Sequence, residues 1–461
     1  MERMIAFDPL LIHRYDRPGP RYTSYPTANW FHEGYGEVDY RAWAARSNAA
    51  RPARPLSVYV HLPFCARLCF YCACNKIVTK NRSRAAPYLH YLAREIAQKA
   101  ALFDPARVVE QLHWGGGTPT FISHAEMREL MQALRTHYRL RDDDRGEYGI
   151  EIDPREVRPG TLPLLRELGF NRLSIGVQDL DPEVQRAVNR IQSEEQTATV
   201  LGEARALGFR SINIDLMYGL PRQRVDTFGR TLERIVALGP DRLSVYNYAH
   251  LPQLFKPQRR IDAAGVPSPS EKLDLLQLAI ERLTQAGYVY IGMDHFAKPD
   301  DELARAQRAG TLHRNFQGYS THAACDLVGL GVTAISHVSD SFAQNHKTLE
   351  AYYDAIDAGR LPVARGLELD ADDRLRADII MQLSCQLALD IPAIAARHGV
   401  DFWRYFASVR AALAPMESDG LIEVRPERIT VLPRGRLLVR NVCMAFDRYL
   451  SAAPAAYSRT V

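Results

Sequence analysis

Three cysteines in one short stretch could hold an iron–sulfur cluster. Cys65, Cys69 and Cys72 have the spacing CxxxCxxC and directly follow the apolar, strand-like run from Ser57 to Leu62. Three thiolates can ligate three irons of a four-iron cluster, whereas an electron-transfer cluster normally has a protein ligand on every iron. The fourth iron would be open to a small ligand, so we predict a single four-iron cluster that takes part in chemistry.

Zinc is the main alternative for this motif. A structural zinc site takes four Cys or His ligands, and the sequence has no second CxxC to supply them. Cys74 and His61 could complete a local set, so the motif alone leaves zinc open. The remaining cysteines lie in apolar stretches where buried structural thiols are expected: Cys325, Cys385 and Cys443.

Composition limits the kind of protein. The chain has 461 residues, 46% of them hydrophobic, which suggests one large catalytic domain and a smaller one. No apolar run approaches the roughly 20 residues of a membrane span, and a net charge of +4 is too mild to indicate nucleic acid. An odd cysteine count of 7 and an opening without a charged-then-apolar leader predict the reducing cytoplasm.

From about residue 56 to 300, β-branched runs alternate with helical stretches that end in Gly. Gly169, Gly208, Gly239 and Gly287 each stand where a helix end needs a left-handed residue. The predicted strands are 57–62, 111–114, 148–152, 172–176, 211–216, 242–246 and 289–293. Such alternation predicts a parallel sheet with helices outside, either a complete or partial (β/α) barrel or, as the competing fold, a doubly wound open sheet.

The flanking segments are less regular. The prolines of residues 18–27 predict an ordered extended arm, and residues 255–269 resemble a connector. After residue 362, helices are predicted at 373–388, 391–398 and 402–416, and strands at 420–424 and 428–431, in a winged-helix-like order. We expect the arginines beyond them, Arg434, Arg436 and Arg440, on a solvated face. The predicted domains are an arm (1–55), a barrel with its extension (56–361) and a mainly helical C-terminal domain (362–461).

Residues after the predicted strands are the functional candidates, because active sites of parallel α/β folds lie at the carboxyl ends of the strands. The run Gly115 to Gly117 could expose backbone carbonyls to the ammonium of a cofactor that carries an amino acid. Glu151 and Asp215 could accept hydrogen bonds from an ammonium or from ribose hydroxyls, although capping of a following helix is an equal alternative for each.

Runs along nearly the whole chain closely resemble the oxygen-independent coproporphyrinogen III oxidase family of the radical S-adenosylmethionine superfamily. These runs are PGPRYTSYPT (18–27), YVHLPFCARLCFYCACNK (59–76), LHWGGGTPT (112–120), EIDPRE (151–156), NRLSIGVQD (171–179), NIDLMYGLP (213–221), YNYAHLP (246–252), GMDHFA (292–297) and HRNFQGYS (313–320). The fold that the resemblance implies is the partial barrel.

The resemblance also implies site residues. Cys65, Cys69 and Cys72 match the cluster ligands, and Cys74 matches a fourth cysteine that characterises the family without ligating the cluster; these four are the catalytic candidates. The family binds two S-adenosylmethionine molecules. Residues matching the contacts of the first, on the cluster, are Tyr59, Gly116, Glu151 and Ile335. Residues matching the surroundings of the second are Tyr71, Gly117, Thr118, Gln178, Arg190, Asp215 and Ala249, with Phe316 and Gln317 beside them.

The implied reaction converts two propionates of coproporphyrinogen III to vinyl groups in haem synthesis. The β C–H bond of a propionate is too weakly acidic for any side-chain base, so a 5′-deoxyadenosyl radical would abstract the hydrogen. The enzyme would need an electron donor to the cluster and an electron acceptor, and we expect a monomer. Because the substrate is a tetracarboxylate, Arg21 and Arg314 are candidates for binding it.

Three alternatives stay open. A related haem chaperone would keep the three cysteines but would be expected to lack the PRYTSYPT segment and Cys74, both present here. A methyltransferase of the same superfamily would use its second S-adenosylmethionine as methyl donor. A pure electron-transfer or zinc protein would have no need of the Gly run and the strand-end acids.

Overall fold

The computed structural model describes residues 5–50, 52–450, 457 and 459–460. Its contacts group the chain into two compact units. Unit 1 comprises Met1–Trp30, Ile280–Ala323 and Leu369–Val461, and unit 2 comprises Phe31–Ala279 and Ala324–Glu368. The domain limits predicted from the sequence, 1–55, 56–361 and 362–461, stay a prediction. Grouping by contacts assigns residues 1–30 and 280–323 to the same unit as the C-terminal segment 369–461.

Unit 2 is built on a sheet with the strand order β9-β8-β7-β6-β4-β1-β14-β15-β16-β17. The parallel strands are β1 (Leu56–Leu62), β4 (Val108–Gly116), β6 (Glu147–Ile152), β7 (Arg172–Gln178), β8 (Ser211–Tyr218), β9 (Arg242–Asn247) and β14 (Asp326–Leu330). The strands β15 (Ile335–Val338), β16 (Ser341–Asn345) and β17 (Val363–Glu368) continue the sheet antiparallel. Short strands are β2 (Phe64–Cys65), β3 (Ile77–Val78) and β5 (Arg139–Leu140).

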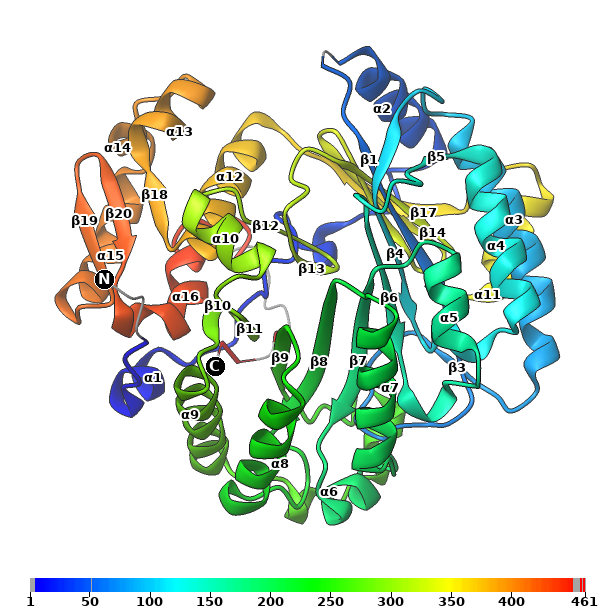
Figure 1. Cartoon of the computed structure of the whole chain (residues 1–461). Coiled ribbons are helices and arrows are strands. Elements are labelled where there is room, and N and C mark those ends of the chain that lie inside the picture. The colour runs from blue at the N-terminus through cyan, green and yellow to red at the C-terminus, as the bar shows by residue number, and fades with distance from the viewer. Residues whose placement is uncertain (1–4, 51, 451–456, 458, 461) are drawn as a thin grey trace. The chain divides into compact units, whose positions relative to one another are not determined.

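Helices cover the outer face of the parallel strands, as expected for a partial (β/α) barrel (Figure 1). They are α3 (Ala85–Ala100), α4 (His124–His137), α5 (Thr161–Glu167), α6 (Pro182–Ala187), α7 (Glu194–Ala206), α8 (Val225–Leu238) and α11 (Leu349–Asp357). Helix α2 (Glu37–Ala49) packs against the antiparallel strands β15, β16 and β17. Single 3-10 turns lie at Arg82–Arg84, Pro119–Phe121, Pro154–Glu156, Lys256–Arg260 and Ala263–Gly265. Helix α9 (Pro269–Gln285) runs from unit 2 into unit 1.

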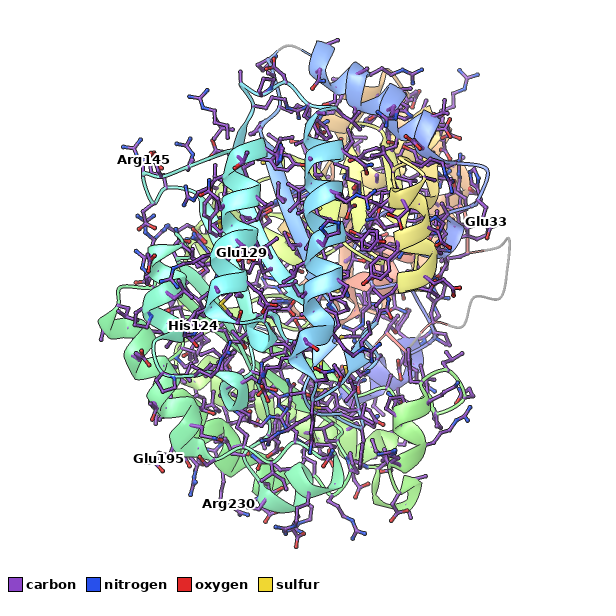
Figure 2. The ribbon with its side chains drawn as sticks, turned by 90° about the vertical axis from the view of Figure 1, so that its right-hand side faces the viewer. Glu33, His124, Glu129, Arg145, Glu195 and Arg230 are labelled. Carbon is purple, nitrogen blue, oxygen red and sulfur yellow. The ribbon has the colours of Figure 1, made fainter. Side chains whose placement is uncertain are left out.

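The helices of unit 2 are amphipathic. In α4, Met127, Leu130, Met131 and Leu134 are buried at the spacing of one helical face. Figure 2 shows the opposite face, where Glu129 of this helix points outward. The predicted left-handed helix ends are confirmed, since Gly169, Gly208, Gly239 and Gly287 all have positive φ.

A buried polar network fixes the turn that follows β14. Lys99 and Glu95 of α3 form an ion pair at 2.9 Å, with 1% and 0% of their side chains exposed. The Lys99 ammonium donates to the Gly329 carbonyl at 2.6 Å, and the Gly331 N–H donates to the Glu95 carboxylate at 2.6 Å. Asn345 completes the network by donating to Glu95 and accepting from Lys99.

Unit 1 contains two β-hairpins and a mainly helical C-terminal part. Its elements are α1 (Pro9–Tyr15), a 3-10 turn Ala28–Trp30, β10 (Val289–Gly292), β11 (His295–Ala297), α10 (Glu302–Ala309), β12 (His313–Asn315), β13 (Gly318–Ser320), α12 (Ala371–Gln386), β18 (Ala388–Asp390), α13 (Ile391–His398), α14 (Phe402–Tyr405), α15 (Ala407–Ser418), β19 (Ile422–Arg425), β20 (Arg428–Val431), a 3-10 turn Pro433–Leu438 and α16 (Val439–Met444). The order β18-β20-β19 forms a small antiparallel sheet, in which β18 lies between α12 and α13 in the sequence and β19 and β20 follow α15. The winged-helix-like arrangement stays a prediction.

Two expectations from the sequence are wrong within unit 1. The strand predicted at 289–293 does not continue the parallel repeat; as β10 it pairs antiparallel with β11. Arg436 and Arg440 are not on a solvated face but buried, and Arg440 donates to the carbonyls of Gly19, Pro20 and Thr460. Arg440 therefore fastens the N-terminal arm within this unit.

No helix in the described part of the chain combines the length and the apolar character that crossing a bilayer requires.

Candidate active site

Backbone hydrogen bonds close the loop that carries the cysteines. The loop leaves β2 and returns through β3, and these two strands pair in parallel. The Ile77 N–H donates to the Pro63 carbonyl at 2.7 Å, and the Thr79 N–H donates to the Cys65 carbonyl at 2.9 Å. The loop is therefore held at its base, directly after β1, where the sequence predicted it.

Cys69 lies against two arginines. Arg155 and Arg190 each direct an N–H toward its sulfur, at 3.5 Å and 3.6 Å. Both guanidiniums also donate to the Asp153 carboxylate, at 2.6 Å and 3.2 Å, and Arg190 donates further to the Gly176 carbonyl at 2.5 Å. This arrangement places two guanidinium donors, both paired with Asp153, against the Cys69 sulfur.

The other loop cysteines have different surroundings. Cys65 accepts a hydrogen bond from the Thr118 hydroxyl at 3.6 Å, and burial raises the pKa of its thiol to about 12. The pKa of Cys72 is lowered, first by a hydrogen bond from the Cys74 thiol and then by the charge of Lys76. The Lys76 ammonium donates to the Cys72 carbonyl at 2.9 Å and so stays beside this end of the loop.

The chemistry of these donors fits an iron–sulfur cluster. All three motif thiols are free, and the lowered pKa of Cys72 favours the thiolate, the form that binds iron. Within the ranges described, however, no three His, Cys, Asp or Glu side chains are gathered as the ligand set of a metal ion. Cluster ligation by Cys65, Cys69 and Cys72 therefore stays a prediction.

The Gly-rich turn after β4 is joined directly to the start of the cysteine loop. The Gly117 N–H donates to the Leu62 carbonyl and the Thr118 N–H to the Phe64 carbonyl, both at 2.8 Å. A Cβ added to Gly117 would lie 2.7 Å from the Phe64 carbonyl oxygen. Only a residue without a side chain allows the two backbone segments to approach this closely.

Glu151 receives hydrogen bonds from the neighbouring strand. The His113 Nε2 lies 3.5 Å from one carboxylate oxygen, and the Gly116 N–H donates to the other at 3.1 Å. Desolvation alone would raise the pKa of Glu151, but these two contacts hold it below its usual value. The Tyr59 ring stacks on His113 with 6.0 Å between the ring centroids. An ionised carboxylate at this position can accept from an ammonium or a hydroxyl.

Asp215 is held by polar residues on its own and the adjacent strand. The Ser174 hydroxyl and the Asn213 amide donate to its two oxygens, at 2.9 Å and 2.8 Å. Burial raises the pKa of this carboxyl to about 6, and the charge of Glu151 acts in the same direction. Asp215 is not a helix cap; its partners are strand side chains.

The remaining candidates of unit 2 lie at neighbouring strand ends. Gln178 ends β7 with a positive φ of 73°. The Gln258 amide donates to the carbonyls of Tyr71 and Ala249, at 3.0 Å and 3.2 Å, and so joins the cysteine loop to the segment after β9. Ile335 opens β15, and its backbone lies against Gly329, the register partner of Tyr59.

Phe316 and Gln317 lie in unit 1, in the turn between β12 and β13. Their assignment to a second cofactor site stays a prediction.

Sequence reasoning missed His113 and Arg155. His113 lies on β4 two residues before Gly115 and therefore faces the same side of the sheet, a periodicity that could have revealed it. Arg155 follows β6 in a 3-10 turn, and no spacing rule connects it to Cys69, which is 86 residues away.

Comparisons with known proteins cover nearly the whole chain. A model of the Radical SAM superfamily matches residues 59–235, and a model of the HemN C-terminal domain matches residues 369–438. The chain is 56% identical to the oxygen-independent coproporphyrinogen III oxidase of Pseudomonas aeruginosa, over 97% of this chain and 96% of that protein. It is 50% identical to the protein of the same name in Escherichia coli, over 100% of this chain and 99% of the other. The solved structure of coproporphyrinogen III oxidase (HemN) from Escherichia coli, a radical SAM enzyme, covers 97% of this chain and 100% of its own, with a TM-score of 0.92 and 50% identity.

Proposed function

The chain belongs to the family of oxygen-independent coproporphyrinogen III oxidases, and from this membership we propose what its residues do in the reaction. It is a radical S-adenosylmethionine oxidoreductase of porphyrin synthesis, which converts two propionates of coproporphyrinogen III to vinyl groups and yields protoporphyrinogen IX. The similarity over the full length of both chains carries this assignment.

Its cofactors are a four-iron cluster and S-adenosylmethionine. When bound, they supply a 5′-deoxyadenosyl radical that can remove a hydrogen atom from an unactivated C–H bond. We propose that Cys65, Cys69 and Cys72 hold the cluster. Arg155 and Arg190 would then orient the Cys69 sulfur, because each directs an N–H toward it.

We propose that two molecules of S-adenosylmethionine bind at the strand ends. Glu151 and the backbone of Gly116 would hold one, because the ionised carboxylate can accept from its ammonium. Asp215 would hold the other, since Ser174 and Asn213 orient its oxygens. Cys74, which donates to Cys72, would adjust the basicity of that ligand without binding iron itself.

The cellular context is part of the proposal. We propose that the protein acts in the cytoplasm as a monomer, receives an electron at its cluster from a reduced donor and passes the electrons of decarboxylation to an external acceptor.

Turnover under anaerobic conditions tests the function. Protein reconstituted with iron and sulfide, given a reductant, S-adenosylmethionine, coproporphyrinogen III and an electron acceptor, is expected to release carbon dioxide and form protoporphyrinogen IX. The Cys65→Ala variant is expected to form none. A methylated porphyrin with S-adenosylhomocysteine would point to the methyltransferase alternative, and tight haem binding without turnover would point to the chaperone.

The stoichiometry of cofactor binding tests the two-site proposal. Calorimetric titration of the reconstituted protein is expected to give two equivalents of S-adenosylmethionine for the wild type and one for Asp215→Asn. Asp226→Asn, which changes an exposed carboxylate on α8, is the matched control and should retain two. One equivalent in the wild type would refute the proposal.

A further inference from the structure

A buried arginine in unit 1 has donors that no group in the described part of the chain satisfies. Arg314 lies on β12, and only 4% of the residue is exposed. Among the described residues, its Nε and Nη1 atoms have no hydrogen-bond partner. Its guanidinium lies over the Tyr319 ring, 5.0 Å from the centroid, on the paired strand β13. Because an unpaired buried charge is costly, such a group calls for an anion.

The charges around Arg314 do not supply that anion. Arg21 pairs with Asp294 at 2.7 Å, so the carboxylate of this neighbourhood is already engaged. Burial lowers the pKa of Arg440 to about 10, with Arg21 and Arg314 contributing in the same direction and Asp294 opposing them. The guanidiniums of Arg21, Arg314 and Arg440 therefore lie in one neighbourhood, in which Arg21 engages Asp294. Arg440 is committed to backbone carbonyls, which leaves Arg314 as the guanidinium with free donors.

The same hairpin offers a second donor. The Nε2 atom of Gln317 is buried and has no acceptor within the described part of the chain. The Gln317 backbone N–H donates to the Asn315 side chain at 2.9 Å, which fixes the turn between β12 and β13. The hairpin thus holds donors from two side chains, and a ligand with acceptors only would satisfy both.

We propose that Arg314, assisted by Gln317, binds an organic carboxylate. The inference rests on the proposed function, because that reaction brings two carboxylate ligands to the protein: the propionates of the porphyrinogen and the carboxylate of S-adenosylmethionine. The planar guanidinium can donate two parallel hydrogen bonds to a carboxylate, and a lysine at the same place could not. Arg21, the other arginine considered from the sequence, pairs with Asp294, and its role in binding the substrate stays a prediction.

Equilibrium binding to the reconstituted holoenzyme tests the proposal without depending on turnover. Coproporphyrin III, the stable oxidised tetracarboxylate, serves as one probe through its fluorescence, and S-adenosylmethionine serves as the other by calorimetry. Arg314→Met removes the charge and keeps the chain length, whereas Arg314→Lys keeps the charge. Arg308→Met on α10, where the exposed arginine donates to the Pro299 carbonyl, is the matched control.

The affinity for at least one of the two probes is expected to fall about tenfold or more in Arg314→Met. In Arg314→Lys, the same affinity should fall by a smaller factor. Weakening for coproporphyrin III alone assigns the site to a propionate, and weakening for S-adenosylmethionine alone assigns it to the cofactor. The Arg308→Met constants should stay within twofold of the wild type.

The proposal is overturned if folded Arg314→Met binds both probes within twofold of the wild type, which would mean that solvent satisfies the guanidinium. Should Arg314→Met fail to fold, Arg314→Lys decides by the same criterion. In the wild type, the tetramethyl ester of coproporphyrin III should also bind more weakly than the acid if the site takes a propionate. Failure of the proposed function would appear separately, as absence of protoporphyrinogen IX from the wild type.

Discussion

At Gly117, one added carbon is enough to disturb the cysteine loop. In Gly117→Ala, the Cβ would meet the Phe64 carbonyl oxygen at 2.7 Å and the Pro63 carbonyl carbon at 2.8 Å, and both are backbone atoms. We expect a loss of about 1–3 kcal/mol in the free energy of unfolding and lower iron content after reconstitution. Urea denaturation and iron analysis measure the two effects.

Gly202→Ala is the control for this substitution. Gly202 lies in α7 with no atom within 4 Å of its added Cβ, so alanine should stabilise the helix by about 0.5–1 kcal/mol. Equal stability and equal iron content in Gly117→Ala and the wild type would contradict the role given to the Gly-rich turn.

Asp215 should make cofactor binding depend on pH. Its pKa is raised to about 6 by burial, so it is ionised at pH 7 and protonated below about pH 6. We expect the affinity of its S-adenosylmethionine site to fall by up to tenfold for each pH unit below about 6, since the neutral acid is a poorer acceptor. Calorimetry between pH 5 and 8 measures this, and a flat profile in the wild type would contradict it. In Asp215→Asn only the other S-adenosylmethionine site remains, and its affinity should not show this dependence on pH.

The raised pKa of Asp215 weakens cofactor binding at low pH but stabilises the folded protein there. Because the folded state holds this proton more tightly than the unfolded chain, the stabilising contribution of Asp215 is complete below its unfolded pKa of about 4 and is lost as the pH rises through about 6.

At the scale of elements, the buried ion pair of α3 should contribute more than an exposed pair at the same spacing. Glu95→Gln would leave the Lys99 ammonium buried without its carboxylate, and we expect a loss of about 3–5 kcal/mol. The exposed pair Glu37 and Arg41 on α2 has the same i, i+4 spacing, and Glu37→Gln should cost no more than about 0.5 kcal/mol. Urea midpoints compare the two, and equal losses would show that burial does not matter.

The alternation of strand and helix predicted six of the seven parallel strands correctly. It missed β14, because this strand follows a hairpin and a loop and no helix precedes it to mark a repeat. The alternation also predicted β10 wrongly as a parallel strand. A helix that ends at Gly287 has the same sequence pattern whether the next strand joins the parallel sheet or starts a hairpin. The chain reverses at Gly292 and Met293, which both have positive φ, and only the first of them is a glycine.

The candidate site was predictable where side chains follow strands, and less so where contacts join distant loops. Glu151 and Asp215 could be located from the strand pattern alone. Their partners could not, because the contacts of His113 with Glu151 and of Ser174 with Asp215 depend on which strands are neighbours and in which register. The pairing of Arg155 with Cys69 depends on tertiary packing.

At the scale of the whole molecule, Arg440 should protect the N-terminal arm from proteolysis. Its hydrogen bonds to the carbonyls of Gly19 and Pro20 hold the segment that includes the Arg21–Tyr22 bond. In Arg440→Met, we expect trypsin to cut this bond about tenfold faster or more, because local opening exposes it. The exposed Arg404 supplies the control Arg404→Met. Mass spectrometry of timed digests measures the rates, and unchanged cleavage would show that other contacts hold the arm.

Unit 1 is assembled from three stretches of chain that are made at widely separated times. Tyr22 and Tyr25 of the arm belong to the same hydrophobic cluster as Leu438 and Phe446, so they leave the ribosome more than 400 residues before some of their partners. At roughly 5–20 residues per second, the arm must wait about 20–80 s before its core can close. Nascent chains therefore carry these two aromatic side chains without their C-terminal partners until translation is nearly complete.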